Sequence, residues 1–133
     1  MEVFTMVGRT WNVRVMSLFE NGEVLDSDKS GRGATGNMVR DIIGTYYNYT
    51  ITVKPKKSHL NEYDEFWNAV TSPVESHQVS FPHNQSYLTF NAYITSASRE
   101  IKIVTEDGFI WKPMTLNFIA MEPQRISLVG GDL

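Results

Sequence analysis

One short segment with helical periodicity lies in a chain whose other regular segments alternate as strands do. In Leu60–Val70 (LNEYDEFWNAV), apolar residues recur three and four positions apart and form one stripe on an α-helix, with Asn61 placed to cap it. The segments Thr45–Val53 and Tyr87–Ile94 instead alternate apolar and polar residues, which predicts half-buried strands. The stripe consists of Tyr63, Phe66, Trp67 and Val70. Two of these residues, Phe66 and Trp67, are expected to pack in the core and fasten the helix to a sheet.

Length and composition restrict the class of protein. A chain of 133 residues suits one domain spanning residues 1–133, and a hydrophobic content of 41% excludes wholesale disorder. The absence of cysteine excludes disulfides, thiol nucleophiles and thiolate metal sites. No apolar run is long enough for a membrane span, and no signal peptide is evident. With a net charge of −3, we expect a soluble chain with no membrane partner and no sequence-specific nucleic-acid binding.

The N-terminal part of the chain contains the longest stretch without periodicity. Strands are expected at Val3–Met6 and Trp11–Leu18, with a tight turn at Asn21-Gly22. Asp26–Asn37 (DSDKSGRGATGN) then has three glycines and no large apolar residue, which predicts a long, mobile, exposed loop. A loop of this length in a compact domain is usually functional, or disordered when the chain is isolated. Met38–Ile43 fits a strand or a short helical turn, and a strand is expected.

The C-terminal half is predicted to form a meander of antiparallel strands. Glu106-Asp107-Gly108 is a hairpin turn signal, Pro113 marks an edge or a bulge, and the tail from Gln124 is expected to be flexible. The fold class is therefore mainly β, a sandwich or barrel of antiparallel strands with one flanking α-helix and one long loop. The expected strands are Gln78–Phe81, Tyr87–Ile94, Arg99–Val104 and Phe109–Met121.

No group of residues predicts a reaction or a bound ion. Gly31–Gly36 matches G-x-G-x-x-G, but no helix follows it to receive a pyrophosphate. Asp26–Asn37 begins like a calcium loop but ends without the required glutamate. The histidines lack metal-ligand spacing and are expected in exposed loops; they are His59, His77 and His83. The lysines after the Tyr-rich strand, Lys54, Lys56 and Lys57, are expected to be a solvated strand end. We therefore expect no enzyme, no catalytic or metal-binding residue and no cofactor.

Three segments resemble small proteins encoded among the tail genes of prophages in Gram-positive bacteria. They are Glu23–Val53, Leu60–Ile94 and Leu116–Gln124, and together they cover most of the chain. The resemblance implies a structural protein of a phage tail, similar to tail-tube or distal-tail proteins. Such proteins have a β-sandwich or barrel with a helix and a long loop, and they form rings that are usually hexameric. The implied localisation is the virion tail, after synthesis in the bacterial cytoplasm, and the implied partners are further copies and other tail proteins.

Aromatic side chains on both faces of one strand add a hint of a protein–protein surface. Tyr46, Tyr47 and Tyr49 have this arrangement, and the loop Asp26–Asn37 is expected to become ordered against a neighbouring subunit. The residues expected at the interface between subunits are Arg32, Met38, Arg40, Tyr46 and Tyr49.

Two other functions stay open from the sequence. A carbohydrate- or ligand-binding β-module would use exposed aromatic rings such as Tyr46 and Trp111 to stack on a sugar. A small hydrolase would use His77 or His83 beside a carboxylate.

Overall fold

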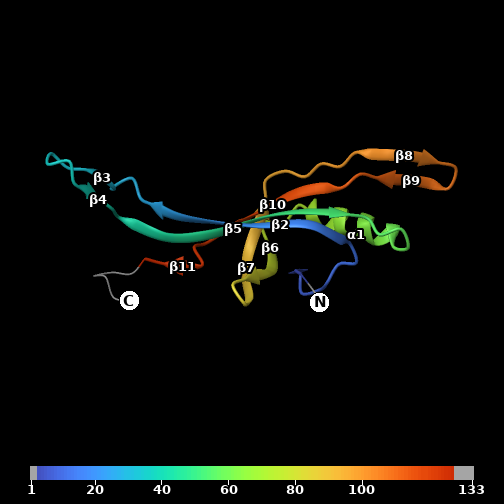
Figure 1. Cartoon of the computed structure of the whole chain (residues 1–133), viewed down its shortest axis with the longest axis horizontal. Helices are drawn as coiled ribbons and strands as arrows, with labels where there is room; N and C mark the ends of the chain where they lie inside the picture. Colours follow the sequence, from blue (N-terminus) through green and yellow to red (C-terminus); the bar gives the residue numbers. More distant parts are fainter. Residues whose placement is uncertain (1–2, 128–133) are drawn as a thin grey trace.

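The computed structural model describes residues 3–127, and its fold is mainly β, as the sequence predicts. One antiparallel sheet of seven strands holds the core, in the order β1, β6, β7, β10, β5, with β11 and β2 also paired to β5 (Figure 1). The sheet does not close into a barrel, because the strands at its two ends, β1 and β2, do not pair with each other. Its strands are β1 (Thr5–Met6), β2 (Arg14–Asp26), β5 (Ile42–Lys54), β6 (His77–His83), β7 (Ser86–Ile94), β10 (Met114–Ala120) and β11 (Arg125–Ile126).

Two small hairpins extend from this sheet toward opposite ends of the molecule (Figure 1). One is formed by β3 (Gly31–Arg32) and β4 (Met38–Val39), and the other by β8 (Ile101–Thr105) and β9 (Gly108–Trp111). The helix α1 (Leu60–Val70) lies on the side of β8 and β9. The molecule is therefore long, with a packed centre and two thin ends.

Alternation along the central strands puts the core on one face of the sheet. Tyr49, Ile51 and Val53 of β5 are buried, whereas Thr50 and Thr52 between them face outward. On the outer face, Thr50 hydrogen-bonds Asn117 at 2.8 Å and Thr52 lies 2.9 Å from Thr115. The sheet is thus apolar on one side and polar on the other, as is usual for an antiparallel sheet.

The helix covers the apolar face through aromatic contacts. Phe66 is fully buried, with its ring centroid 5.8 Å from that of Phe4 and 5.4 Å from that of Trp11. Trp67 is only partly buried against the core, so its expected core position is confirmed in part. The predicted cap is wrong: His59 precedes the helix, and no side chain caps it. Among the described residues, no helix has the length and hydropathy of a membrane span.

The predicted turn at Asn21-Gly22 is also wrong. Both residues lie inside β2, where Asn21 pairs with Asn48 and Gly22 with Tyr47, and neither has a positive φ. Glycine is useful at position 22 for another reason: a Cβ atom there would lie 3.3 Å from the Tyr47 ring. The strand continues because its partner is β5, which lies some thirty residues further along the chain, and not the segment next to it.

The contrast in burial between Phe66 and Trp67 leads to a stability prediction. Phe66→Ala should lower the free energy of unfolding by about 3–5 kcal/mol, because it leaves a cavity in a closed core. Trp67→Ala should cost less, because solvent already reaches part of that side chain. Urea unfolding of both variants measures the difference, and an equal or smaller loss for Phe66→Ala would contradict this packing.

Candidate functional site

The most distinctive feature of the surface is a long β-hairpin that leaves the core. Strands β2 and β5 pair along their whole length, from Arg14 opposite Lys54 to Asp26 opposite Ile42, with register shifts near each end of the ladder, and so extend well beyond the last contact of β5 with β10. We call residues 20–48 the first arm; it comprises the outer parts of β2 and β5 together with β3 and β4. The predicted loop Asp26–Asn37 is the end of this hairpin: residues 27–30 and 33–37 lie outside strands, as expected of a loop, and Gly31–Arg32 forms β3.

A partly buried polar contact fixes the arm where it joins the core. The Tyr49 hydroxyl donates to the Glu20 carboxylate, and His83 Nδ1 lies 2.5 Å from the same oxygen. Burial raises the pKa of Glu20, but hydrogen bonds from Tyr49 and His83 and the attraction of His83 outweigh it, so this pKa lies below its ordinary value. The pKa of Tyr49 is raised, first by burial and then by its bond to Glu20.

The C-terminal segment braces the arm from its other edge. The Gln124 side chain accepts from the Tyr47 amide at 2.9 Å and donates to the Tyr47 carbonyl at 2.8 Å. Beyond it, β11 pairs with β5, and it approaches so closely that a Cβ atom on Gly44 would lie 2.4 Å from the Arg125 carbonyl oxygen. The tail was expected to be flexible from Gln124; this is wrong for residues 124–126, and residues 128–133 lie outside the described part.

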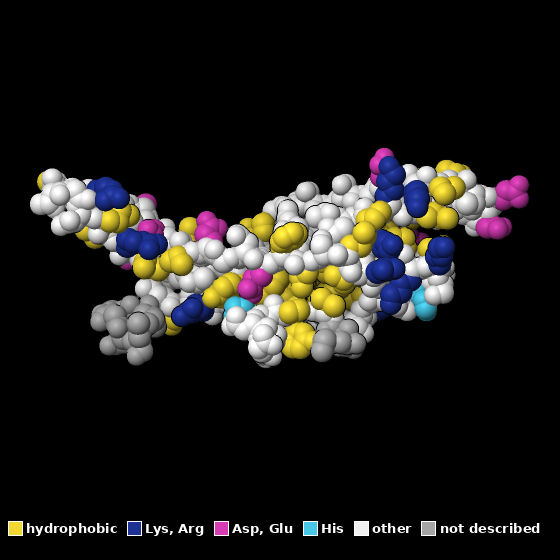
Figure 2. All heavy atoms as spheres, in the orientation of Figure 1, with side chains coloured by type: hydrophobic (Ala, Val, Ile, Leu, Met, Phe, Trp, Pro, Cys, Tyr) yellow, Lys and Arg dark blue, Asp and Glu magenta, His cyan; other side chains and the backbone are white. Residues whose placement is uncertain are grey.

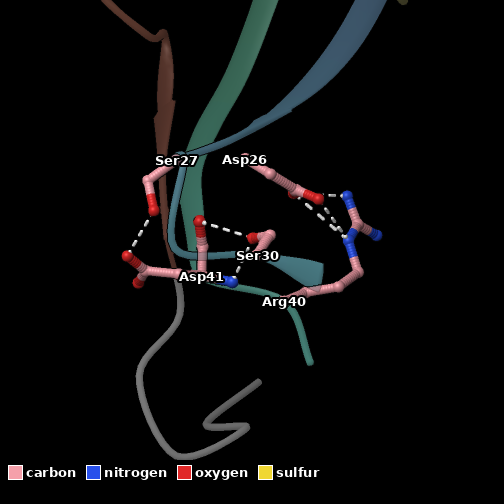
Figure 3. Close-up of polar contacts among 5 residues, drawn as sticks. All are labelled: Asp26, Ser27, Ser30, Arg40 and Asp41. Atoms are coloured by element: carbon pink, nitrogen blue, oxygen red, sulfur yellow. Dashed lines mark hydrogen bonds and ion pairs between the residues drawn. The ribbon is translucent and has the colours of Figure 1, made fainter. Parts of the chain in front are cut away.

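Side-chain contacts also hold the outer end of the arm. Arg40 donates to both oxygens of the Asp26 carboxylate, with Nη2 2.7 Å from Oδ1, and Ser27 donates to Asp41 at 2.6 Å (Figure 3). Ser30 Oγ accepts from the Asp41 amide at 2.6 Å. Hydrogen bonding to Arg40 keeps the pKa of Asp26 below its ordinary value. The end of the arm is therefore shaped before any partner is present.

The structure of this segment bears on its two sequence motifs, the start of a calcium loop and the G-x-G-x-x-G pattern. The Asp26 carboxylate is engaged by Arg40, and among the described residues no cluster of His, Cys, Asp or Glu is arranged to hold a metal ion. Gly31–Gly36 is followed by strand β4, where a dinucleotide loop needs the start of a helix. Instead the Gly36 amide donates to the Gly33 carbonyl and Gly36 takes a φ of +86°, so these glycines form a turn.

Apolar side chains are exposed along the first arm. Val39 is 61% exposed and Val24 49%, and neither contacts the core. The first arm has an open edge along β2, and an open edge with apolar side chains in water is a surface suited to a partner chain. The exposed apolar residues of the first arm are Val24, Leu25, Met38, Val39 and Ile43.

The second arm is the β8–β9 hairpin, residues 101–111, at the other end of the molecule. Its base is held by Arg99, whose guanidinium carbon lies 3.9 Å from the Trp111 ring centroid and 4.8 Å from that of Trp67. Arg99 also pairs with Asp64 of the helix at 2.8 Å. The Tyr63 hydroxyl donates to the Lys112 carbonyl at 2.8 Å, and burial raises the pKa of Tyr63 to about 12. Helix α1 thus anchors the second arm.

The residues predicted at an interface are divided between the first arm and the core. Arg32, Met38 and Arg40 lie on the outer part of the arm, and Met38 is 46% exposed. Tyr46 is half-buried on the arm, opposite Glu23. Tyr49 is only 1% exposed and stacks on Phe81 at 4.5 Å, so its placement at a surface is wrong. The sequence pattern shows aromatic side chains on both faces, but not that the inner face is closed by the core of the same chain.

Two of the three histidines, His77 and His83, are placed differently from the sequence expectation of exposed loops, whereas His59 is exposed outside any helix or strand, as expected. His77 is 7% exposed in β6, and its burial lowers its pKa. His83 ends the same strand at the base of the first arm, where it contacts Glu20. His59 precedes the helix and lies 2.7 Å from the Ser58 hydroxyl. The hydrolase alternative requires a histidine beside a carboxylate, and His83 lies beside the Glu20 carboxylate. In this structure the pair of side chains connects the first arm to the core.

Comparison with protein-family models and with curated proteins found no match to this chain.

The contact between Glu20, Tyr49 and His83 leads to a pH prediction. Because folding lowers the pKa of Glu20, its contribution to stability is complete above the ordinary value of 4.5 and is lost as the pH falls through the folded value. Glu20→Gln should therefore flatten the fall in the free energy of unfolding below about pH 4.5. Denaturation over a pH series measures this, with Glu23→Gln on the same strand as control. An equal effect of both substitutions would contradict the role of Glu20.

Proposed function

We propose that this chain is a structural subunit of a phage or prophage tail, at the tube or at the tube–baseplate junction, which assembles with further copies into a ring. The observation that carries the proposal is the pair of hairpin arms, which extend from one core in opposite directions and expose apolar side chains (Figure 1). The proposed role is assembly without catalysis, in the virion tail, with other tail proteins as neighbours.

Both arms are energetically incomplete in a single copy. The second arm is a two-stranded sheet of its own, which has marginal stability in water, and the first arm has an open edge along β2; open edges invite pairing with another chain. Val39 on the first arm and Val104 on the second are 61% and 68% exposed, so contact with a partner would remove apolar surface from water at both ends.

The opposite placement of the arms favours head-to-tail contact. If one end of a subunit contacts a different surface of the next, the contact repeats from copy to copy and closes into a ring when the rotation allows. The tight contacts at Asp26, Arg40 and Gln124 keep the first arm extended, which lowers the entropy lost when it docks. The resemblance of three segments to prophage tail proteins supports the choice of a tail over other assemblies.

The carbohydrate-binding alternative is less well supported by the geometry. Trp111, one of its two proposed stacking residues, is partly buried and one face of its ring is covered by the Arg99 guanidinium. Tyr46 is half-buried at a position in the ladder opposite Glu23.

Deletion of residues 30–36 tests the part of the proposal that concerns the first arm. The deletion removes the hairpin end without touching the core, so the melting temperature should change little while assembly is lost. Light scattering and negative-stain microscopy measure assembly. A deletion variant that assembles like the wild type would remove the first arm from the proposed mechanism.

A matched pair of substitutions separates the arm surface from general hydrophobicity. Val39→Ser on the arm should weaken assembly, whereas Val74→Ser should not, although the two valines are similarly exposed at 61% and 55%. Equal effects of the two substitutions would contradict a specific contact through the arm.

A further inference from the structure

A groove beside the second arm gathers positive charge over an apolar floor. It has a volume of about 790 Å³ and lies between β2, the end of β5 and the β8–β9 hairpin. Met16, Ile103 and Ile110 line its floor. Figure 2 shows Lys and Arg side chains gathered at the base of the second arm, next to apolar ones. The cationic residues that line this basic groove are Arg14, Lys54, Lys56, Lys57 and Lys102.

These cations are not neutralised within the subunit. None of the five forms an ion pair with a carboxylate among residues 3–127, and none of the described residues that line the groove is acidic. Arg14 and Lys54 are direct cross-strand partners, an arrangement of like charges that destabilises a sheet. Lys56 is held in place by the Asn12 side chain at 2.6 Å. The sequence had suggested only a solvated strand end here; the fold instead adds Arg14 and Lys102 to that cluster.

The chain itself carries a segment of matching chemistry. The tip of the second arm presents Glu106 and Asp107, and residues 103–111 contain no Lys or Arg. Val104 and Phe109 pair across the strands next to this tip and are 68% and 57% exposed. An acidic turn with apolar flanks is the complement of a basic groove with an apolar floor.

The tip of the same copy does not reach the groove. Lys102, Ile103 and Ile110 line the groove at the base of the hairpin, and the strands carry Glu106 and Asp107 away from it, to the far end of the arm (Figure 2). The first arm offers a poorer match, because Lys29 and Arg32 lie among its acids and Arg40 already engages Asp26.

We propose that the basic groove binds the Glu106-Asp107 tip of the second arm of another copy of this chain. This contact rests on the proposed function, since it requires that copies assemble, and it specifies one pair of surfaces by which they do so. The carboxylates of the tip lie among the five cations, and Val104 and Phe109 cover the apolar floor. The contact should weaken as salt is added, because partly exposed charges are screened.

Charge reversal on each side tests the contact in the full-length chain. Glu106→Lys with Asp107→Lys reverses the charge of the tip, and Lys57→Glu with Lys102→Glu reverses the charge of two of the cations that line the groove. Each pair should weaken self-association on the order of tenfold, measured by sedimentation at low salt. Glu75→Lys with Glu122→Lys makes the same change in net charge as the tip variant at exposed sites outside the arms, and it should have little effect.

Combining the variants distinguishes a direct contact from a change in total charge. Each reversed chain fails to bind its own kind, but the lysine tip of one fits the glutamate groove of the other, so an equimolar mixture should regain association. A chain carrying all four substitutions should regain it as well. Thermal unfolding checks that every variant is folded.

Each outcome has a distinct meaning. Loss of association in both reversals with recovery in the mixture supports the contact. Assembly that survives both reversals overturns this inference and leaves the proposed function intact. Sensitivity to the groove reversal alone also overturns it, and assigns the groove to a different acidic segment of another copy. A wild-type chain that stays monomeric contradicts both proposals.

Discussion

Strand β5 belongs both to the core and to the first arm, and the rest of the structure depends on its continuity. Its inner half, Tyr49–Val53, contributes alternate side chains to the core and pairs with β10, its outer half pairs with β11, and β2 pairs with both halves. Because the ladder with β2 does not stop at the edge of the core, the arm is a continuation of the sheet. Tyr49 lies at the boundary, with its ring in the core and its hydroxyl at Glu20, so core packing also fixes the base of the arm.

The parts of the fold that the sequence predicts are those with local periodicity. Helix α1 begins and ends where its apolar spacing indicates, and the alternation of Tyr49, Ile51 and Val53 correctly places them on one buried face. The hairpin at Glu106-Asp107-Gly108 is correct for the same reason, because its turn chemistry lies within a few residues. Each of these elements is specified by neighbours along the chain.

The errors concern pairings between distant residues. Asn21-Gly22 has the composition of a turn, but pairing with Asn48 and Tyr47 keeps both residues in a strand. Asp26–Asn37 has the composition of a loop and lies mostly outside strands, but its composition does not show that it ends a ladder that begins at Arg14 and Lys54. Glu20 meets His83 across 63 positions of sequence, and Gln124 meets Tyr47 across 77. Local composition carries no signal for such contacts, so the extended arm and the basic groove emerge only from the fold.

The central claim is that the chain is a subunit whose two ends are completed by other copies. Its most direct test is the native mass of the purified protein by light scattering over a wide range of concentration, with negative-stain microscopy of the same fractions. The account predicts a mass of several copies that grows with concentration, and particles shaped as rings or short tubes. A single copy at every concentration, with no particles in the images, would contradict it.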